Sequence, residues 1–215
     1  MYSSMTESRR SFPDWETLYK NQKVESMPWY NENLDADLEE ELEKREINQG
    51  RFLDLGTGPG TQAIKLHERG FNVTATDLSD TAIKKAQSIY NNNNNNNNNK
   101  KVDFRVDNIL NSNLNEKEFD YVFDRGCFHV ISTDDRKRYI MQVNRILKDN
   151  GILFLKCFSD KEQGEEGPHR FSKGKLKETF ENENFKIENM KETVYQGTLN
   201  PLPKALFATM TKQTK

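Results

Sequence analysis

The chain has 215 residues, of which 31% are charged, and its formal net charge is −2. This near-neutral balance gives no general bias toward nucleic acid or an anionic membrane, and the length suits one domain with a sizeable core. No apolar run approaches a membrane span, and the polar N-terminus has no hydrophobic signal region. Two cysteines, Cys127 and Cys157, cannot form a disulfide framework, so we expect a reduced, cytoplasmic setting.

Residues 1–46 form an aromatic and acidic leader. Trp15 and Tyr19 are four residues apart, which places both rings on one face of a short helix. A proline precedes Trp29 and drives the residue before it out of the helical region, so this stretch should be extended. The rings either attach the leader to the domain or form a lid over a ligand. Residues 34–46 carry leucines at four-residue intervals and predict a solvated helix on the core, to which we assign no function.

Residues 50–66 predict a buried strand, a tight glycine-rich turn and an amphipathic helix. The strand contains one acid, Asp54, and the turn contains Gly56, Gly58 and Gly60. A side chain at Gly56 or Gly58 would fill a ligand's space or require a positive φ. The spacing departs from the dinucleotide pattern G-x-G-x-x-G. A carboxylate near this turn would repel a pyrophosphate, whereas it suits a cationic amino-acid ligand.

The next two strands each end in an acid. Residues 71–77 are rich in Val and Thr and end at Asp77, whose carboxylate can accept two hydroxyl donors at once. The alternative is that Asp77 caps the following helix, although Ser79 could do the same. The strand over 102–107 ends at Asp107, which either binds a ligand or turns the chain.

Asparagine occupies every position from Asn91 to Asn99. Such a run cannot bury apolar surface, so we expect a disordered surface insertion and assign it no role.

Residues 119–130 predict a fourth strand that runs into a loop carrying Asp124, Arg125, Cys127 and His129. In an open α/β sheet, ligands bind at this edge. Asp124 either faces the ligand or pairs with Arg125 and caps the loop. Cys127 and His129, with no second pair of ligands nearby in sequence, fall short of a zinc signature, so we expect no metal.

The last third of the chain continues the alternation of strands and helices. Residues 151–158 form an apolar run suited to a central parallel strand. The polar loop that follows carries His169 and Arg170, which either contact a substrate or are merely solvated. The remaining elements are a helix over 173–182 and strands over 185–195 and 204–212.

The motif DLGTGPG resembles motif I of the class I S-adenosylmethionine-dependent methyltransferases, and the resemblance extends from about Trp15 to the end. It implies an α/β, Rossmann-like fold with a seven-stranded sheet in the order 3-2-1-4-5-7-6, in which strand 7 is antiparallel and helices cover both faces. The methyltransferase domain would span residues 47–215, after the leader. Asp-Arg-Gly at Asp124 resembles the thiopurine, thiol and halide methyltransferases. Lysine methyltransferases that act on elongation factors have Asp-Lys-Gly, from which Arg125 departs.

The resemblance also implies the cofactor, S-adenosyl-L-methionine, and a role for each motif residue. The glycine turn would hold its amino-acid end, the acid of the second strand its ribose, the third strand end its adenine, and the leader would close over it. The cofactor residues implied in this way are Asp54, Gly56, Gly58, Gly60, Asp77, Leu78, Asp107, Asn108 and Trp29, and those that flank the methyl group and receive the substrate are Asp124, Arg125 and His129.

We therefore expect methyl transfer to a small-molecule nucleophile, thiol-like or heterocyclic, by a monomer with no nucleic-acid or membrane partner. The absence of a basic groove in the sequence disfavours RNA. A protein lysine methyltransferase of similar compact fold remains the alternative. A third possibility is an inactive cofactor-binding scaffold, against which the intact motif I and the two downstream acids argue.

Overall fold

A computed structural model describes residues 12–93, 101–164 and 166–214. The asparagine run expected to be disordered lies outside the described residues from position 94 onward, and its first three residues complete the helix that ends at Asn93. The leader is described from Phe12.

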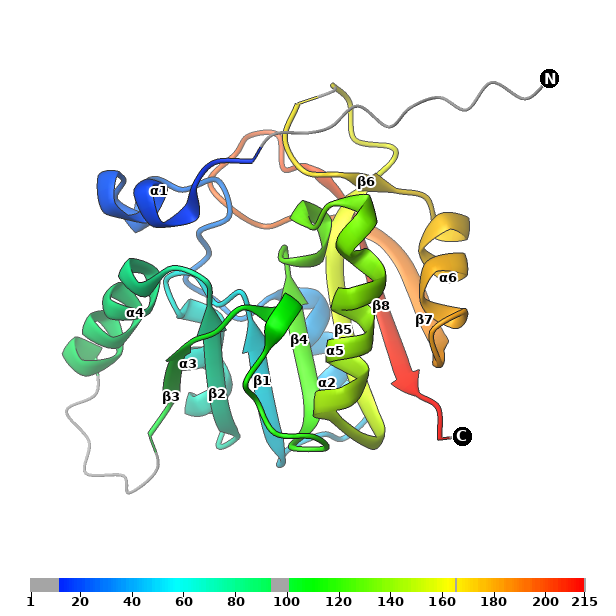
Figure 1. Cartoon of the computed structure of the whole chain (residues 1–215). Helices are drawn as coiled ribbons and strands as arrows, with labels where there is room; N and C mark the ends of the chain where they lie inside the picture. Colours follow the sequence, from blue (N-terminus) through cyan, green and yellow to red (C-terminus); the bar gives the residue numbers. More distant parts are fainter. Residues whose placement is uncertain (1–11, 94–100, 165, 215) are drawn as a thin grey trace.

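One sheet organises the chain, in the order β3-β2-β1-β4-β5-β8-β7 (Figure 1). The first five strands of this order, β3, β2, β1, β4 and β5, are parallel to one another, and β8 runs antiparallel to both β5 and β7. The predicted order is confirmed, because the predicted sixth and seventh strands are β7 and β8. A two-residue strand, β6, pairs with β5 and was not predicted. The strands are β1 Arg51–Leu55, β2 Asn72–Asp77, β3 Asp103–Val106, β4 Phe119–Arg125, β5 Leu147–Ser159, β6 Arg170–Phe171, β7 Phe185–Val194 and β8 Lys204–Lys212.

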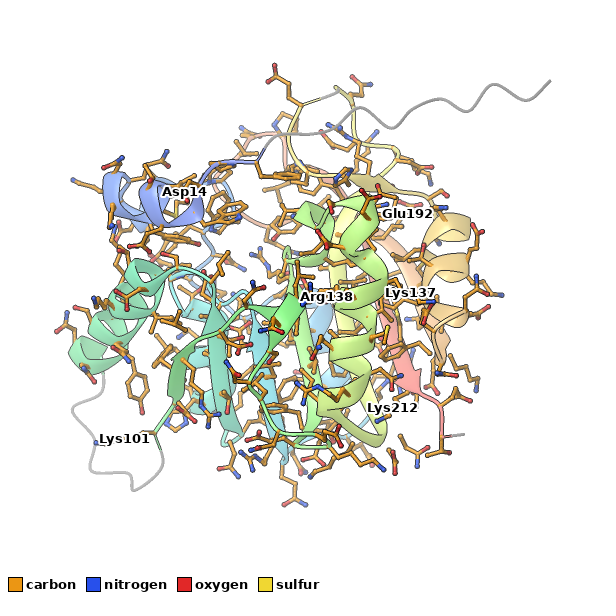
Figure 2. The ribbon with its side chains drawn as sticks, viewed as in Figure 1. Asp14, Lys101, Lys137, Arg138, Glu192 and Lys212 are labelled. Atoms are coloured by element: carbon orange, nitrogen blue, oxygen red, sulfur yellow. The ribbon has the colours of Figure 1, made fainter. Side chains whose placement is uncertain are left out.

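Helices cover both faces of this sheet, as Figure 1 shows. On one face α5 and α6 bury a core around Phe128, Tyr139 and Phe180, and on the other α2 and α3 pack on Phe52 and Phe154. Charged side chains point outward, such as Lys137 and Arg138 on α5 (Figure 2). The helices are α1 Trp15–Asn21, α2 Ala36–Lys44, α3 Thr61–Glu68, α4 Asp80–Asn93, α5 Arg136–Ile146 and α6 Lys173–Glu181, with 3-10 turns at Val24–Ser26, Ile109–Asn111, Phe128–Val130 and Thr133–Asp135.

The carboxyl ends of the parallel strands meet at one edge of the sheet. Leu55 at the end of β1 is in register with Thr76 of β2 and Asp124 of β4. Helix α1 lies across this edge, next to α4 (Figure 1). It begins where the Asp14 side chain accepts a hydrogen bond from the amide of Thr17 at 2.7 Å. An open α/β sheet binds ligands at this edge, so the fold brings the leader to the expected site.

Candidate functional site

A cavity of about 720 Å³ lies at the carboxyl edge of the strands, between the glycine turn, the leader and the loops after β4 and β5. Its size is within the range of small-ligand pockets. Most of its walls are apolar or aromatic, with a few polar groups at the strand ends. At one end are the residues that follow β2 and β3, and at the other are His129, Phe158 and Tyr195. Gly56, after β1, and Cys127, after β4, lie against each other, since a Cβ on Gly56 would be 3.0 Å from Cβ of Cys127.

The three glycines of the turn do different work. All have positive φ, at +69°, +52° and +77° in order, so each favours glycine. Gly56 lines the cavity. A Cβ on Gly58 would lie 2.5 Å from the hydroxyl of Tyr19 on α1, so this glycine lets the leader close. A Cβ on Gly60 would lie 2.7 Å from Cβ of Ala86, so this glycine lets α3 and α4 pack.

Asp54, the buried acid of β1, supports the glycine turn through a hydrogen bond. The Thr57 hydroxyl donates to the Asp54 carboxylate, and burial raises the pKa of Asp54 to about 6. Asp54 and the second and third glycines were predicted to contact the cofactor. None of the three lines the cavity, whereas Gly56 does, and their contact with the cofactor stays a prediction.

The predicted residues at the ends of β2 and β3 do line the cavity, among them Asp77, Leu78 and Asp107. The carboxylate of Asp77 accepts hydrogen bonds from the amides of Gly58 and Ser79, both at 2.9 Å. A carboxylate has about four acceptor sites, so Asp77 can still accept a donor from a ligand. The alternative role of helix cap belongs to Ser79, whose hydroxyl oxygen accepts the amide of Ala82.

The two carboxylate oxygens of Asp107 differ in their hydrogen bonding. Oδ1 accepts the amide of Asn113 at 2.9 Å, whereas Oδ2 is buried and has no partner among the described residues. A buried carboxylate oxygen without a donor is costly, so Oδ2 marks a place for a donor from a ligand. Asn108 lines the cavity beside it. Leu78 also lines the cavity, and its side chain is 56% exposed.

The leader closes the cavity with aromatic rings. Trp15, Tyr19 and Trp29 all line it, and the ring of Trp29 lies edge-on to the other two, with centroids 5.9 and 6.4 Å apart. The side chain of Glu16 on α1 accepts hydrogen bonds from the hydroxyls of Ser79 and Thr81, both at 2.6 Å. These contacts attach α1 to the start of α4, and the position of the rings supports the lid interpretation of the leader.

The loop after β4 is held together by Asp124. Its carboxylate accepts the backbone amides of Gly126, Cys127 and Phe128 at 2.8 to 3.0 Å, and also the hydroxyl of Tyr139. It is fully buried and does not line the cavity. Both oxygens of Asp124 therefore accept from the loop or from Tyr139 on α5, and its contact with a substrate stays a prediction. The other interpretation, a loop cap, fits these contacts.

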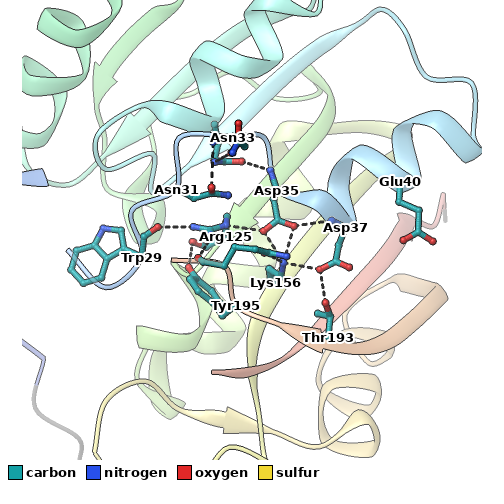
Figure 3. Close-up of polar contacts among 12 residues, drawn as sticks. Trp29, Asn31, Asn33, Asp35, Asp37, Glu40, Arg125, Lys156, Thr193 and Tyr195 are labelled. Carbon is teal, nitrogen blue, oxygen red and sulfur yellow. Dashed lines mark hydrogen bonds and ion pairs between the residues drawn. The ribbon is translucent and has the colours of Figure 1, made fainter. Parts of the chain in front are cut away.

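Arg125 belongs to a buried network of charges that sequence reasoning missed (Figure 3). Its Nε donates to Asp35 at 2.8 Å, and its other nitrogens donate to the carbonyl oxygens of Trp29 and Gln196. Asp35 also binds the ammonium of Lys156, at 2.7 and 2.8 Å. The segment expected to be a solvated helix thus contributes a fully buried acid. Lys156, the single charge inside an apolar strand run, was the available signal, since a buried lysine needs a buried partner.

His129 is buried and stands at the end of the cavity opposite the cofactor acids. Its ring stacks on Tyr195, with centroids 5.7 Å apart, and meets Phe158 edge-on. The backbone amide of Phe158 donates to its Nδ1 at 3.2 Å. The Tyr195 hydroxyl donates to the carbonyl oxygen of Arg125. This end of the cavity therefore offers ring faces and few polar atoms.

The remaining expectations concern the loop before α6 and metal binding. Arg170 lines the cavity, whereas His169 is buried and donates its amide to the carbonyl oxygen of His129. Within the described ranges, no group of three or more His, Cys, Asp or Glu residues could hold a metal ion. No helix in the same ranges is long and apolar enough to cross a membrane.

The sequence is similar to those of known methyltransferases. The family profile of the methyltransferase domain matches residues 52–151. An uncharacterised methyltransferase of Schizosaccharomyces pombe is 33% identical over 110 residues, which are 50% of this chain and 71% of that protein. A glycine/sarcosine N-methyltransferase of Parasynechococcus marenigrum is 32% identical over 105 residues, 48% of this chain and 36% of that protein.

Solved structures share the fold. A structure that concerns the conversion of a disulfide bond into a thioacetal group during echinomycin biosynthesis has a TM-score of 0.78 at 22% identity, over 93% of this chain and 92% of that chain. The 1,6-didemethyltoxoflavin-N1-methyltransferase of Burkholderia thailandensis, solved with 1,6-didemethyltoxoflavin and S-adenosylhomocysteine, has a TM-score of 0.66 at 19% identity, over 83% and 78%.

Proposed function

Because the chain belongs to the class I S-adenosylmethionine-dependent methyltransferases, we propose that it methylates a small molecule whose nucleophile is a thiol-like or heterocyclic atom. The observation that carries this proposal is the far end of the cavity, where His129, Phe158 and Tyr195 form an aromatic wall under the leader. Ring faces of this kind suit a flat, apolar acceptor.

The other end of the cavity fits the cofactor. The remaining acceptor capacity of Asp77 suits the ribose hydroxyls, and the orphaned oxygen of Asp107 suits the adenine amine. Leu78 offers an exposed apolar side chain for the adenosine to cover, and Gly56 leaves space beside the turn. S-adenosyl-L-methionine supplies a methyl group on a sulfonium when bound. The protein's part is to orient an acceptor and exclude water, because a nucleophile with a lone pair needs positioning more than activation.

The roles of the predicted substrate residues differ within this proposal. His129 contacts the acceptor. Arg125 holds the leader, the strand edge and the loop after β7 together, and Asp124 fixes the loop that carries His129. The last two are positioning residues.

The experiment compares two acceptor pools with a methyl-labelled cofactor. The protein is incubated with a panel of thiols and nitrogen heterocycles, and separately with a whole-protein extract. We expect label in the small-molecule fraction and none in a discrete protein band. Label confined to a protein, released as methyl-lysine on hydrolysis, would support the lysine methyltransferase alternative and overturn the proposal.

A further inference from the structure

Resting on the proposed function, we infer that His129 binds the methyl acceptor as a hydrogen-bond donor through Nε2–H and does not remove the acceptor's proton. The acceptor class that follows is a flat, apolar molecule that arrives with its nucleophilic atom already unprotonated, such as a thiolate. The inference starts from the two nitrogens of one ring.

The first nitrogen is committed to the backbone. Phe158 on β5 presents an amide N–H to Nδ1 of His129 at 3.2 Å. An amide nitrogen can only donate, so Nδ1 must accept and carries no proton. The neutral ring then has its proton on Nε2. Protonating the ring would break the bond to Phe158 and leave its amide without a partner.

The second nitrogen is open to a ligand. Nε2 has no hydrogen-bond partner among the residues that the structure describes, although only 4% of the surface of His129 is exposed. It lies beside Gly126, where a Cβ would come within 3.1 Å of it. Gly126 has a φ of +108°, which favours glycine, and a Cβ there would also lie 2.5 Å from the Tyr195 hydroxyl, so its lack of a side chain leaves room beside both groups. Both residues line the cavity.

The surroundings keep the ring neutral. Burial lowers the pKa of His129 to about 3, and the charges of His169 and Arg125 act in the same direction. Tyr195, after β7, stacks on the ring, and Cys127 lies two residues before His129 in the chain. Burial raises the pKa of both, so both stay uncharged near neutral pH. An imidazole with such a low pKa is a poor base, and it remains a neutral hydrogen-bond donor through Nε2–H across the physiological pH range.

Three other polar side chains that line the cavity are already engaged. The Tyr195 hydroxyl donates to the carbonyl oxygen of Arg125, and the guanidinium of Arg125 is bound by Asp35 and two carbonyl oxygens. Glu162, on the loop after β5, accepts the amide of Lys204. Nε2–H of His129 is thus a donor that this wall still offers to an acceptor.

The chemistry balances without a protein base. The acceptor loses its proton to solvent before it binds. Its lone pair then forms the bond to the methyl carbon, while the sulfonium sulfur keeps the electron pair of the bond that breaks. A hydrogen bond from Nε2–H to a second lone pair of the same atom orients that atom and favours the unprotonated form of the acceptor.

The first test reads the ring directly. The chain has three histidines, so the protein with S-adenosylhomocysteine bound can be labelled with ¹⁵N-histidine, and the signal lost in His129→Gln identifies this ring. We expect the Nε2–H tautomer, unchanged between about pH 5 and pH 8. A proton on Nδ1, or titration near the ordinary histidine pKa, would overturn the inference whether or not an acceptor is known.

The second test uses two flat thiols of different acidity, 4-nitrothiophenol and 4-methylthiophenol, as acceptors. The inflection in kcat/KM against pH should follow the pKa of each thiol. His129→Phe should lose roughly 10- to 100-fold in kcat/KM, the effect of removing a hydrogen bond to a charged group, and His129→Gln should recover most of it. His67→Gln, away from the cavity, is the matched control. An inflection that ignores the thiol and disappears in both His129 variants would mean that His129 is a base. If neither thiol is methylated, the thiol proposal fails while the tautomer still decides the role of His129.

Discussion

At the scale of single residues, Asp35 is a buried acid that pairs with two buried positive charges. Its carboxylate is fully buried between the ammonium of Lys156 and the guanidinium of Arg125. Asp37 supplies a second acid to Lys156 at 2.7 Å, so two acids and two bases are buried together. Charges out of water are tolerated only when each has its partner, so the loss of one leaves the others exposed to the low-dielectric interior.

We therefore predict that Asp35→Asn lowers the free energy of unfolding by about 3–5 kcal/mol, because it leaves a buried positive charge uncompensated. Glu43→Gln removes an exposed acid of the same helix and should stay within about 0.5 kcal/mol of the parent. Urea unfolding of both variants measures the difference. Equal stability of the two would mean that the network around Lys156 does not hold the leader to the sheet.

Single residues also mark where sequence reasoning fell short. Asp77 and Asp107 were placed correctly at the cavity because a strand end points its last residue toward the ligand edge. Asp124 also ends a strand, yet its oxygens bind the amides of its own loop. The sequence contains both kinds of acid in the same context, and the direction of a carboxylate depends on which amides the loop presents. Asp35 meets Arg125 across 90 residues of chain, which no local pattern reveals.

At the scale of elements, α1 is the latch that attaches the leader to α4. Glu16 accepts both the Thr81 amide at 3.1 Å and the hydroxyls of Ser79 and Thr81. The hydrogen bonds from Ser79 and Thr81 hold the pKa of Glu16 at about 2. The folded value lies below the ordinary one of 4.5, so the contribution of the latch is complete above pH 4.5 and is lost as the pH falls toward 2.

We predict that Glu16→Ala loosens the lid and weakens binding of S-adenosylhomocysteine on the order of tenfold near neutral pH, since three hydrogen bonds to a charged group are lost. Glu25→Ala, an exposed acid of the leader, is the matched control and should bind as the parent does. Calorimetric titration of both variants makes the comparison. If Glu16→Ala binds as tightly as the control, α1 only attaches the leader and does not close over the ligand.

At the scale of the whole molecule, the order of the strands was predictable and the way the leader docks was not. Motif I, the acid of β2 and the final antiparallel pair each occupy a fixed place in this fold, so the order followed once they were recognised. The docking of the leader depends on Lys156, Arg125 and the loop after β7, which come from distant parts of the chain. The turn glycines were found from sequence, but only the packing of α1 and α4 separates Gly56 from Gly58 and Gly60.

The central claim is that the cofactor lies at the strand ends with its ribose on Asp77, and calorimetric titration with S-adenosylhomocysteine tests it most directly. The parent should bind. Asp77→Ala should weaken binding by about 1–3 kcal/mol, because the ribose hydroxyls lose their acceptor and the amides of Gly58 and Ser79 are left unpaired. Asp80→Ala, an exposed acid three residues away, should leave the affinity unchanged. If Asp77→Ala and Asp80→Ala bind equally well while both remain folded, the ligand does not lie where this account places it.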